Sequence, residues 1–370
     1  MIRVLHIMNG ADLGGISTLV LNYYRFIDRS ACHFDFVLTS TDALGRNGKL
    51  LEDLGASFYW IAMKSRHPIR HASDLRKLLR SRQYDAIHVH QTLTSFFDLA
   101  IAKHTGVQLR IAHAHSADLK RRGFLERVKL RFYQALNRHY ATELLACSRD
   151  AVRFAYGEKA LKDPRVFVLP NAVDCRRFAF QPELRNPLRD ELNIPRDAFV
   201  FGSVGRLSPE KNMEFLIRLL PELLKRRPGT FCLLIGDGVQ RNALETKAKE
   251  FGISDRVIFT GQRGDVDKLL NVMDVFVVSS VHEGFCIAAL EAGSNGLRLV
   301  LSDGVPEDVC FFSDCSVLSL SEPMSRWCDA ILQAQGRDPE GAQIAAAHGF
   351  DIRQAANTLA QMYEQALTKN

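Results

Sequence analysis

The sequence predicts an α/β protein made of two doubly wound, parallel-sheet domains. Three observations lead to this fold class. The chain has 370 residues, more than a single hydrophobic core usually organises. Short apolar runs that are typical of buried strands alternate with stretches of helical periodicity, and this alternation favours parallel sheets. A polar, proline-containing stretch at 176–195 interrupts the alternation once and is interpreted as a linker.

The first half, residues 1–174, is expected to form one sheet that binds ligands at the carboxyl ends of its strands. The expected strands are 3–8, 34–39, 58–62, 86–90, 109–115, 144–148 and 166–169. A glycine-rich turn with Gly14 and Gly15 separates the first strand from a helix at about 16–27. Glycine lets a backbone approach a ligand closely, but this turn lacks the G-x-G-x-x-G fingerprint of dinucleotide sites.

Two of these strands end in histidine pairs, His88 with His90 and His113 with His115. Because side chains alternate along a strand, each pair lies on one face of the sheet. Four histidines could suggest zinc, but no carboxylate or cysteine stands nearby at ligand spacing. We therefore expect hydrogen-bonded histidines in the sheet or its crevice, and no metal.

The helix expected at 124–140 carries a basic stripe. Its cations are Lys120, Arg127, Arg131 and Arg138, and the apolar residues of the broadly opposite face are Leu125, Val128, Phe132 and Leu136. The stripe is either a solvated face of a core-packed helix or a contact for an anionic membrane or lipid phosphate. Residues 1–177 hold 28 Lys and Arg against 16 Asp and Glu, whereas residues 178–370 hold 20 against 26. This asymmetry favours an anionic surface as a partner of the first half.

From composition we expect a cytoplasmic protein that can lie peripherally on the inner face of the cell membrane, and no nucleic-acid partner. The first residues lead directly into a strand, and no apolar run approaches the roughly 20 residues of a membrane span. The eight cysteines include no C-x2-C pair, so we expect reduced core residues and neither a metal nor a disulfide framework.

The second half, residues 175–351, repeats the alternation. Its expected strands are 199–204, 230–236, 257–261, 275–280, 298–303 and 316–320. After the first of these come Gly205, Arg206 and Lys211, in a tight turn before a helix at 213–227. Two cations together with the free N–H groups of a helix start suit a diphosphate.

The stretch 275–296 places Glu283 and Gly284 in a turn after a buried strand, and Glu291 inside the helix that begins near Phe285. Carboxylates accept bidentate hydrogen bonds from the diols of sugars, so two of them beside a phosphate-binding helix start favour a nucleotide-sugar. Asp265 and Asp267 have the D-x-D form of a metal site. They are expected to cap a helix instead.

Four pieces in this order resemble the retaining GT-B glycosyltransferases of family 4. They are the Gly205–Lys211 turn, 235–238, 259–263, and the two glutamates eight residues apart. The resemblance implies two Rossmann-like domains facing across a cleft, with the acceptor in the first and the donor in the second. It also implies that the last helix, at about 352–370, packs back onto the first domain.

The resemblance also assigns roles to residues. Glu283 would contact the transferred sugar, Glu291 the ribose, and His115 the sugar site, while Arg206 and Lys211 would stabilise the leaving diphosphate. Arg263 would lie near the nucleobase. The implied donor-binding residues are Gly14, Gly15, Gly205, Arg206, Lys211, Gly236, Arg263, Glu283, Gly284, Phe285, Cys286 and Glu291.

The implied reaction is metal-independent, cofactor-free transfer of a hexose from a UDP-sugar, with retention. The acceptor would be a glycan or a polyprenyl-diphosphate-linked glycan in bacterial surface polysaccharide synthesis. Two alternatives stay open: a UDP-sugar 2-epimerase of the same fold, and a non-catalytic nucleotide-sugar-binding subunit. The presence of all four motif residues favours the transferase. These are Arg206, Lys211, Glu283 and Glu291.

Overall fold

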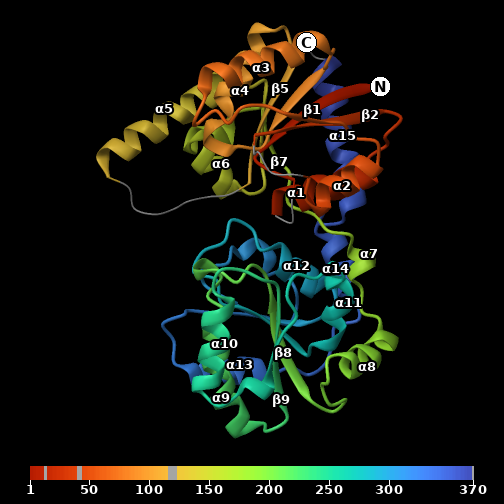
Figure 1. The fold of residues 1–370 in the computed structure, drawn as a ribbon, viewed down its shortest axis with the longest axis vertical. Helices are drawn as coiled ribbons and strands as arrows, with labels where there is room; N and C mark the ends of the chain where they lie inside the picture. The colour runs from red at the N-terminus through yellow and green to blue at the C-terminus, as the bar shows by residue number, and fades with distance from the viewer. Residues whose placement is uncertain (12–14, 40–43, 116–122, 369–370) are drawn as a thin grey trace. The chain divides into compact units, whose positions relative to one another are not determined.

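The structure is a computed structural model that describes residues 1–11, 15–39, 44–115 and 123–368 (Figure 1). The chain divides into two compact units. Unit 1 comprises Met1–Ala172 with Gly349–Asn370, and unit 2 comprises Val173–His348. Among the described residues, no helix combines the length and the apolar character needed to cross a membrane.

Unit 1 contains a seven-stranded sheet in the order β3-β2-β1-β4-β5-β6-β7, in which neighbouring strands pair in parallel. Its strands are β1 (Ile2–Met8), β2 (Cys32–Leu38), β3 (Phe58–Trp60), β4 (Ala86–Val89), β5 (Leu109–Ala114), β6 (Glu143–Ala146) and β7 (Val166–Val168). The strand order reverses between β1 and β4. In open α/β sheets, the carboxyl ends of strands at such a switch point form the ligand crevice.

Helices cover both faces of this sheet. They are α1 (Gly15–Phe26), α2 (Arg46–Asp53), α3 (Pro68–Ser81), α4 (Ser95–His104), α5 (Phe124–Tyr140), α6 (Arg149–Tyr156) and α15 (Ile352–Thr368), with the 3-10 turns η1 (Thr92–Thr94) and η2 (Glu158–Lys162). Alternating residues of β1 enter two apolar clusters: Val4 faces the α1 and α15 side, and Leu5 and Ile7 face the α3 and α4 side. The last helix, α15 (blue in Figure 1), packs against α1 within unit 1.

Unit 2 contains a six-stranded parallel sheet in the order β10-β9-β8-β11-β12-β13, with the switch point between β8 and β11. Its strands are β8 (Phe199–Val204), β9 (Thr230–Ile235), β10 (Val257–Phe259), β11 (Val275–Val278), β12 (Arg298–Ser302) and β13 (Cys315–Leu318). Its α-helices are α7 (Cys175–Phe178), α8 (Pro182–Glu191), α9 (Glu214–Arg226), α10 (Arg241–Glu250), α11 (Val266–Leu269), α12 (Ile287–Ser294), α13 (Met324–Leu332) and α14 (Gly341–Ala347).

The prediction of a linker at 176–195 was wrong, because this stretch forms α7 and α8 of unit 2. Arg189 in α8 is buried and donates hydrogen bonds to the Val272 carbonyl at 2.9 Å and to the Asp274 carboxylate at 3.1 Å. Arg185 pairs with the same carboxylate. The polar composition therefore reflects arginines that anchor α8 to the segment before β11. Pro182 stands in the first turn of the helix, where no N–H donor is needed.

Candidate active site

The switch point of unit 2 holds an ion pair between two residues that the sequence singled out. Lys211 ends the 3-10 turn η3 (Pro209–Lys211), which follows β8, and Glu283 lies in the loop between β11 and α12. The Lys211 ammonium donates a hydrogen bond to the Glu283 carboxylate, which also accepts one from the Ser280 hydroxyl at 2.7 Å. The backbone N–H of Glu283 donates to the Gly304 carbonyl at 2.9 Å. The fold therefore brings Lys211, predicted to bind the diphosphate, into direct contact with Glu283, predicted to bind the sugar.

Arg206 belongs to the same β8 loop but is exposed. Within the part of the chain that the structure describes, its guanidinium makes no hydrogen bond or ion pair. Lys211 is already paired with a carboxylate, so Arg206 is the cation of the motif whose hydrogen-bond donors are open to a ligand.

Gly236 and Gly15, two of the predicted donor-binding glycines, differ in whether their surroundings leave room for a side chain. Gly236 has a φ of +138°, and a Cβ atom there would stand 1.9 Å from the Gly205 carbonyl oxygen, so the loops after β8 and β9 pack backbone to backbone. Among the described residues, a Cβ on Gly15 would meet nothing within 4 Å. Packing of the described residues thus requires Gly236 but not Gly15. Gly14 lies outside the described residues.

Glu291 lies in α12, where burial raises the pKa of its carboxyl to about 8, against an opposing effect of Arg177 and with a further contribution from Asp267. In the ligand-free protein this carboxyl therefore keeps its proton near neutral pH. In the loop before α12, Phe285 and Cys286 are buried beside Gly284. Burial raises the pKa of the Cys286 thiol to about 12, so this thiol is not a nucleophile at neutral pH.

The prediction that Asp265 and Asp267 cap a helix is confirmed for their position, because Asp265 is the N-cap residue of α11 and Asp267 lies in its first turn. Asp265 precedes α11 but makes no cap hydrogen bond, and its carboxylate accepts from Arg263 at 2.8 and 2.7 Å. Asp267 accepts from Arg177 at 2.6 Å. Both carboxylates are therefore engaged by arginine in charge-assisted hydrogen bonds. Arg263, the predicted nucleobase contact, is held in place by its hydrogen bonds to Asp265.

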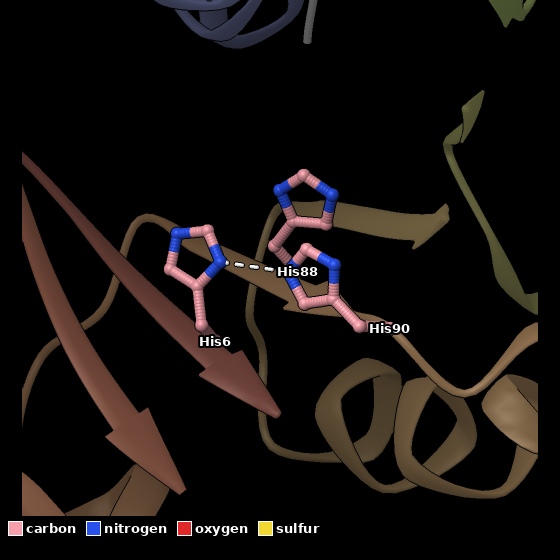
Figure 2. Close-up of side chains that lie close together, drawn as sticks. All are labelled: His6, His88 and His90. Atoms are coloured by element: carbon pink, nitrogen blue, oxygen red, sulfur yellow. Dashed lines mark hydrogen bonds between the residues drawn. The ribbon is translucent and has the colours of Figure 1, made fainter. Parts of the chain in front are cut away.

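The switch point of unit 1 holds a cluster of buried histidines. His6 on β1 was missed by the sequence analysis, although it stands in register with His88 on β4. Its Nδ1 lies 2.9 Å from Nε2 of His90, as Figure 2 shows, and His90 Nδ1 lies 2.8 Å from Nε2 of His115. A histidine near the carboxyl end of a third neighbouring strand was the signal that would have identified it.

His88 belongs to a second hydrogen-bonded chain. Its Nδ1 lies 2.7 Å from the Tyr363 hydroxyl of α15, and its Nε2 lies 3.0 Å from Nδ1 of His113. Burial lowers the pKa of His6 and of His115 to about 3 and holds those of His88, His90 and His113 well below the usual value, with mutual repulsion adding to the effect in these last three. All five rings are therefore neutral at physiological pH.

Unit 1 also contains a cavity of about 500 Å³ that the sequence did not reveal. It is lined by residues that follow the strands or begin α4: Asn9, Thr39, Met63, Lys64, Ser65, Gln91, Thr94, Phe96 and Phe97. Lys64 is fixed by an ion pair with Asp98 at 2.9 Å and by the Thr94 carbonyl at 2.9 Å. The described lining combines apolar rings with neutral polar groups and one cation.

Helix α5 does not pack as expected. The residues of α5 that pack against the rest of unit 1 are polar. Asn137 donates to the Thr92 carbonyl at 3.1 Å, and Gln134 donates to the Phe154 carbonyl at 2.9 Å. Of the apolar residues opposite the basic stripe, Leu136 is half-buried, whereas Leu125 at 80%, Val128 at 51% and Phe132 at 59% are exposed, which disagrees with the core-packed alternative.

The basic stripe on α5 is only partly free. Arg127 and Arg131 are exposed, whereas Arg138 donates a hydrogen bond to the Tyr156 carbonyl. Lys120 lies outside the described residues. In its described part, the first half of α5 therefore exposes both arginines and apolar side chains.

Comparison with known proteins identifies the family. Residues 13–177 match the model of Glycosyltransferase Family 4, and residues 185–309 match that of Glycosyl transferases group 1. The chain is 30% identical to the putative glycosyltransferase EpsF of Bacillus subtilis, over 100% of this chain and 98% of that protein. It is 28% identical to an Escherichia coli UDP-Gal:alpha-D-GlcNAc-diphosphoundecaprenol alpha-1,3-galactosyltransferase, over 62% of this chain and 60% of that protein.

Solved structures agree on the fold. HepE of Anabaena, solved in complex with UDP, superposes with a TM-score of 0.81 at 20% identity and covers 99% of this chain and 100% of its own. Two parallel-sheet units, the matched family models and a full-length relative thus lead to one conclusion. The chain belongs to the family 4 glycosyltransferases and is a glycosyltransferase with the GT-B fold.

Proposed function

We propose that this glycosyltransferase transfers a hexose from a UDP-sugar to a glycan or a polyprenyl-diphosphate-linked glycan in surface polysaccharide synthesis. The observation that carries the proposal is the Lys211–Glu283 pair at the switch point of unit 2, with the exposed Arg206 on the same loop. Support for the donor and acceptor classes comes from the HepE structure, which contains UDP, and from the Escherichia coli relative, whose name specifies UDP-Gal and a diphosphoundecaprenol glycan.

The charges of unit 2 suit a diphosphate leaving group without a metal. Arg206 and Lys211 supply two cations, and the N-terminus of α12 adds unpaired N–H groups. When phosphate binds Lys211, Glu283 is released from its ion pair and becomes available to the sugar, whose ring gains positive charge as its bond to phosphate breaks. Stabilisation that appears only at that stage accelerates the reaction.

We infer a front-face route to retention. The bond between the anomeric carbon and the diphosphate oxygen breaks, and the acceptor oxygen bonds to the same face of that carbon. The acceptor proton passes to the departing phosphate oxygen, so no protein nucleophile is needed. Among the described residues that line the unit 1 cavity there is no carboxylate, which agrees with this route.

The unit 1 cavity is our candidate for acceptor binding. Phe96 and Phe97 offer apolar surface to a sugar face, and Gln91 and Asn9, which hydrogen-bond each other at 3.0 Å, offer polar groups to its hydroxyls. The exposed arginines and apolar residues of α5 would bring such an enzyme to an anionic membrane, where a lipid-linked acceptor resides.

The test combines a donor screen with a transfer assay. Thermal shifts with UDP-, GDP- and ADP-sugars identify the donor, because a ligand that binds only the native state raises its stability. Transfer from labelled donor to a polyprenyl-diphosphate glycan should then proceed undiminished in EDTA, and NMR of the product should show the anomeric configuration of the donor.

The outcomes separate the alternatives. Stabilisation by a GDP-sugar and by no UDP compound would overturn the donor assignment, and loss of transfer in EDTA with rescue by manganese would overturn metal independence. Without acceptor, slow release of free sugar supports a transferase. Epimerised UDP-sugar in that incubation would instead support an epimerase, and binding with no turnover under any condition would support a non-catalytic subunit.

A further inference from the structure

The histidines of unit 1 form an end-to-end chain that terminates at His115. His6 and His90 lie with ring planes 15° apart and centroids 5.2 Å apart, while their facing nitrogens are only 2.9 Å apart. His90 and His115 repeat this arrangement, with planes 23° apart, centroids 5.0 Å apart and nitrogens 2.8 Å apart. Near-parallel planes with nitrogens much closer than centroids mean that the rings meet edge to edge, as in N–H···N hydrogen bonds.

This geometry favours shared protons over a shared metal. Nitrogens of His6, His88 and His90 lie within 4.8 Å of one another, and so do those of His90, His113 and His115. A metal, however, needs lone pairs that converge on one point about 2.0–2.1 Å from each nitrogen. In both pairs of the chain the closest nitrogens instead point at each other across a hydrogen-bond distance.

Counting protons leaves two tautomeric states for the hydrogen-bonded row of His6, His90 and His115. Burial keeps the three rings neutral, so each carries one N–H, and two of the three protons occupy the two hydrogen bonds. The third must sit at one end, on Nε2 of His6 or on Nδ1 of His115. Both atoms are buried and have no hydrogen-bond partner in the described chain.

The two ends are not equivalent. His6 is 1% exposed and packs against Phe34 and Phe36, with ring centroids 4.2 and 5.3 Å away. His115 is half-buried and follows β5 at the strand ends, the edge at which open α/β sheets bind ligands, so a bound ligand can supply an acceptor to its Nδ1. Unpaired buried N–H groups are rarer than under-satisfied acceptors. An N–H on Nε2 of His6, among phenyl rings, has no such acceptor, so we assign the spare proton to Nδ1 of His115 and the bare nitrogen to His6.

We propose that His90 and His6 are positioning residues that hold His115 as its neutral Nδ1–H tautomer, so that it donates a hydrogen bond to an oxygen of the transferred sugar. The contact between His115 and the sugar rests on the function proposed above. The assignment of the His115 tautomer is independent of that function. In this state His6 Nδ1–H donates to His90 Nε2, and His90 Nδ1–H donates to His115 Nε2. The tautomer of a histidine is set by the hydrogen bond that its other nitrogen makes.

The first experiment reads the tautomer directly in the ligand-free protein. Two-bond ¹H–¹⁵N correlation spectra of histidine-labelled protein should show Nδ1 of His115 protonated and Nε2 bare. His90→Leu removes the donor to Nε2, so the His115 proton should redistribute between its two nitrogens. His90→Asn places an amide N–H at the position of Nδ1 of His90 and should restore the parental pattern. His88→Leu is the matched control. His88 is an equally buried neighbour on β4, but its hydrogen bonds go to Tyr363 and His113 and not to His115.

The second experiment measures transfer by the same variants. His90→Leu should lower kcat by about 10- to 100-fold, on the scale of outer-shell partners of a functional histidine, and His90→Asn and His88→Leu should stay near the parent. A parent with bare Nδ1 on His115, an unchanged tautomer in His90→Leu, or a stoichiometric metal on these histidines in the purified protein would each overturn the proposal. The expected spectra in a protein that transfers no sugar would refute the proposed function and leave the tautomer assignment intact. If His90→Leu fails to fold, the parent spectrum and His90→Asn still decide.

Discussion

The two units place different chemistry at the same topological position. Unit 2 repeats the order of the first six strands of unit 1, so the switch point lies between β1 and β4 in one and between β8 and β11 in the other. The first crevice holds neutral, buried histidines joined to one another. The second holds a lysine, an exposed arginine and glutamates. One architecture therefore supports two kinds of site, because loops and strand-end residues, not the sheet, determine the chemistry.

The difference predicts how each crevice responds to a ligand. In unit 2 Lys211 is already paired with Glu283, so a diphosphate that binds Lys211 must displace this partner. The histidines of unit 1 carry no charge and need no such exchange. Ligand binding should reorganise unit 2 electrostatically and leave the unit 1 network in place.

The largest effect is expected from Glu283→Gln. This substitution keeps the size of the side chain but removes the charge that Lys211 binds and that the proposed transition state would use. We expect kcat to fall by an amount equivalent to ~2–4 kcal/mol, the scale of a lost active-site electrostatic contact. Steady-state kinetics with saturating acceptor measure it.

Ser280→Ala serves as the control for Glu283, because it removes only the hydroxyl that donates to the same carboxylate. A hydrogen bond to a charged group contributes about 1.5–3 kcal/mol, but the charge of Glu283 remains, so Ser280→Ala should lower kcat less than Glu283→Gln does. If Ser280→Ala and Glu283→Gln reduce kcat equally, the charge of Glu283 has no special role.

The two glycine loops provide the second test. A Cβ on Gly236 collides with the Gly205 carbonyl and the φ is unfavourable, so Gly236→Ala should destabilise unit 2 by about 2–4 kcal/mol. Gly15→Ala meets open space and should leave the melting temperature unchanged while raising the donor KM, if backbone contact with the ligand is its purpose. Calorimetry and kinetics on both variants separate these roles. A destabilised Gly15→Ala, or a stable Gly236→Ala, would contradict the assignment.

Sequence patterns predicted the alternation of elements well because apolar runs and periodicity reflect burial, which the sheet imposes locally. They predicted the pairing of elements less well. Polar composition at 176–195 indicated a linker, since nothing local shows that Arg185 and Arg189 meet Asp274 from far along the chain.

Partner choice within the candidate site was also beyond local patterns. Asp265 occupies a helix start, and only the fold shows that Arg263 competes for its carboxylate. His6 was missed for the same reason, because a lone histidine in a strand gains meaning only from the strands beside it. The motif residues Lys211 and Glu283 could be named from sequence, but their direct contact could not.

Helix α5 tests whether the basic half of the chain binds a surface. Replacing Arg127 and Arg131 with Glu should weaken binding to vesicles that contain anionic lipid, at about 1 kcal/mol for each arginine removed. The matched control is Arg76→Glu with Arg80→Glu, which makes the same charge change on exposed positions of α3. Co-sedimentation at fixed ionic strength measures both. Equal loss in the two double variants would mean that net charge, and not α5, drives binding, and no binding by the parent would exclude the surface.

The smallest effect expected is a pH dependence that belongs to Glu291. Its pKa of about 8 means that the carboxyl is protonated at neutral pH in the free enzyme. If the ribose diol binds the carboxylate, the carboxyl must first lose its proton. For each pH unit below 8 this makes the free energy of donor binding less favourable, by at most about 1.4 kcal/mol. The donor KM should therefore fall as pH rises and level off above about 8.

Glu291→Gln should flatten this profile, whereas Glu283→Gln should retain it. A second readout is independent of ligand. A carboxyl whose folded pKa is raised from 4.5 to about 8 binds more protons folded than unfolded, so its contribution to stability is present below pH 4.5 and is lost as pH rises through 8. The difference in melting temperature between parent and Glu291→Gln should change across that window. An unchanged difference, together with a profile that survives Glu291→Gln, would assign the titration to another group, and a KM that rises with pH would mean that the protonated acid is the form that binds ribose.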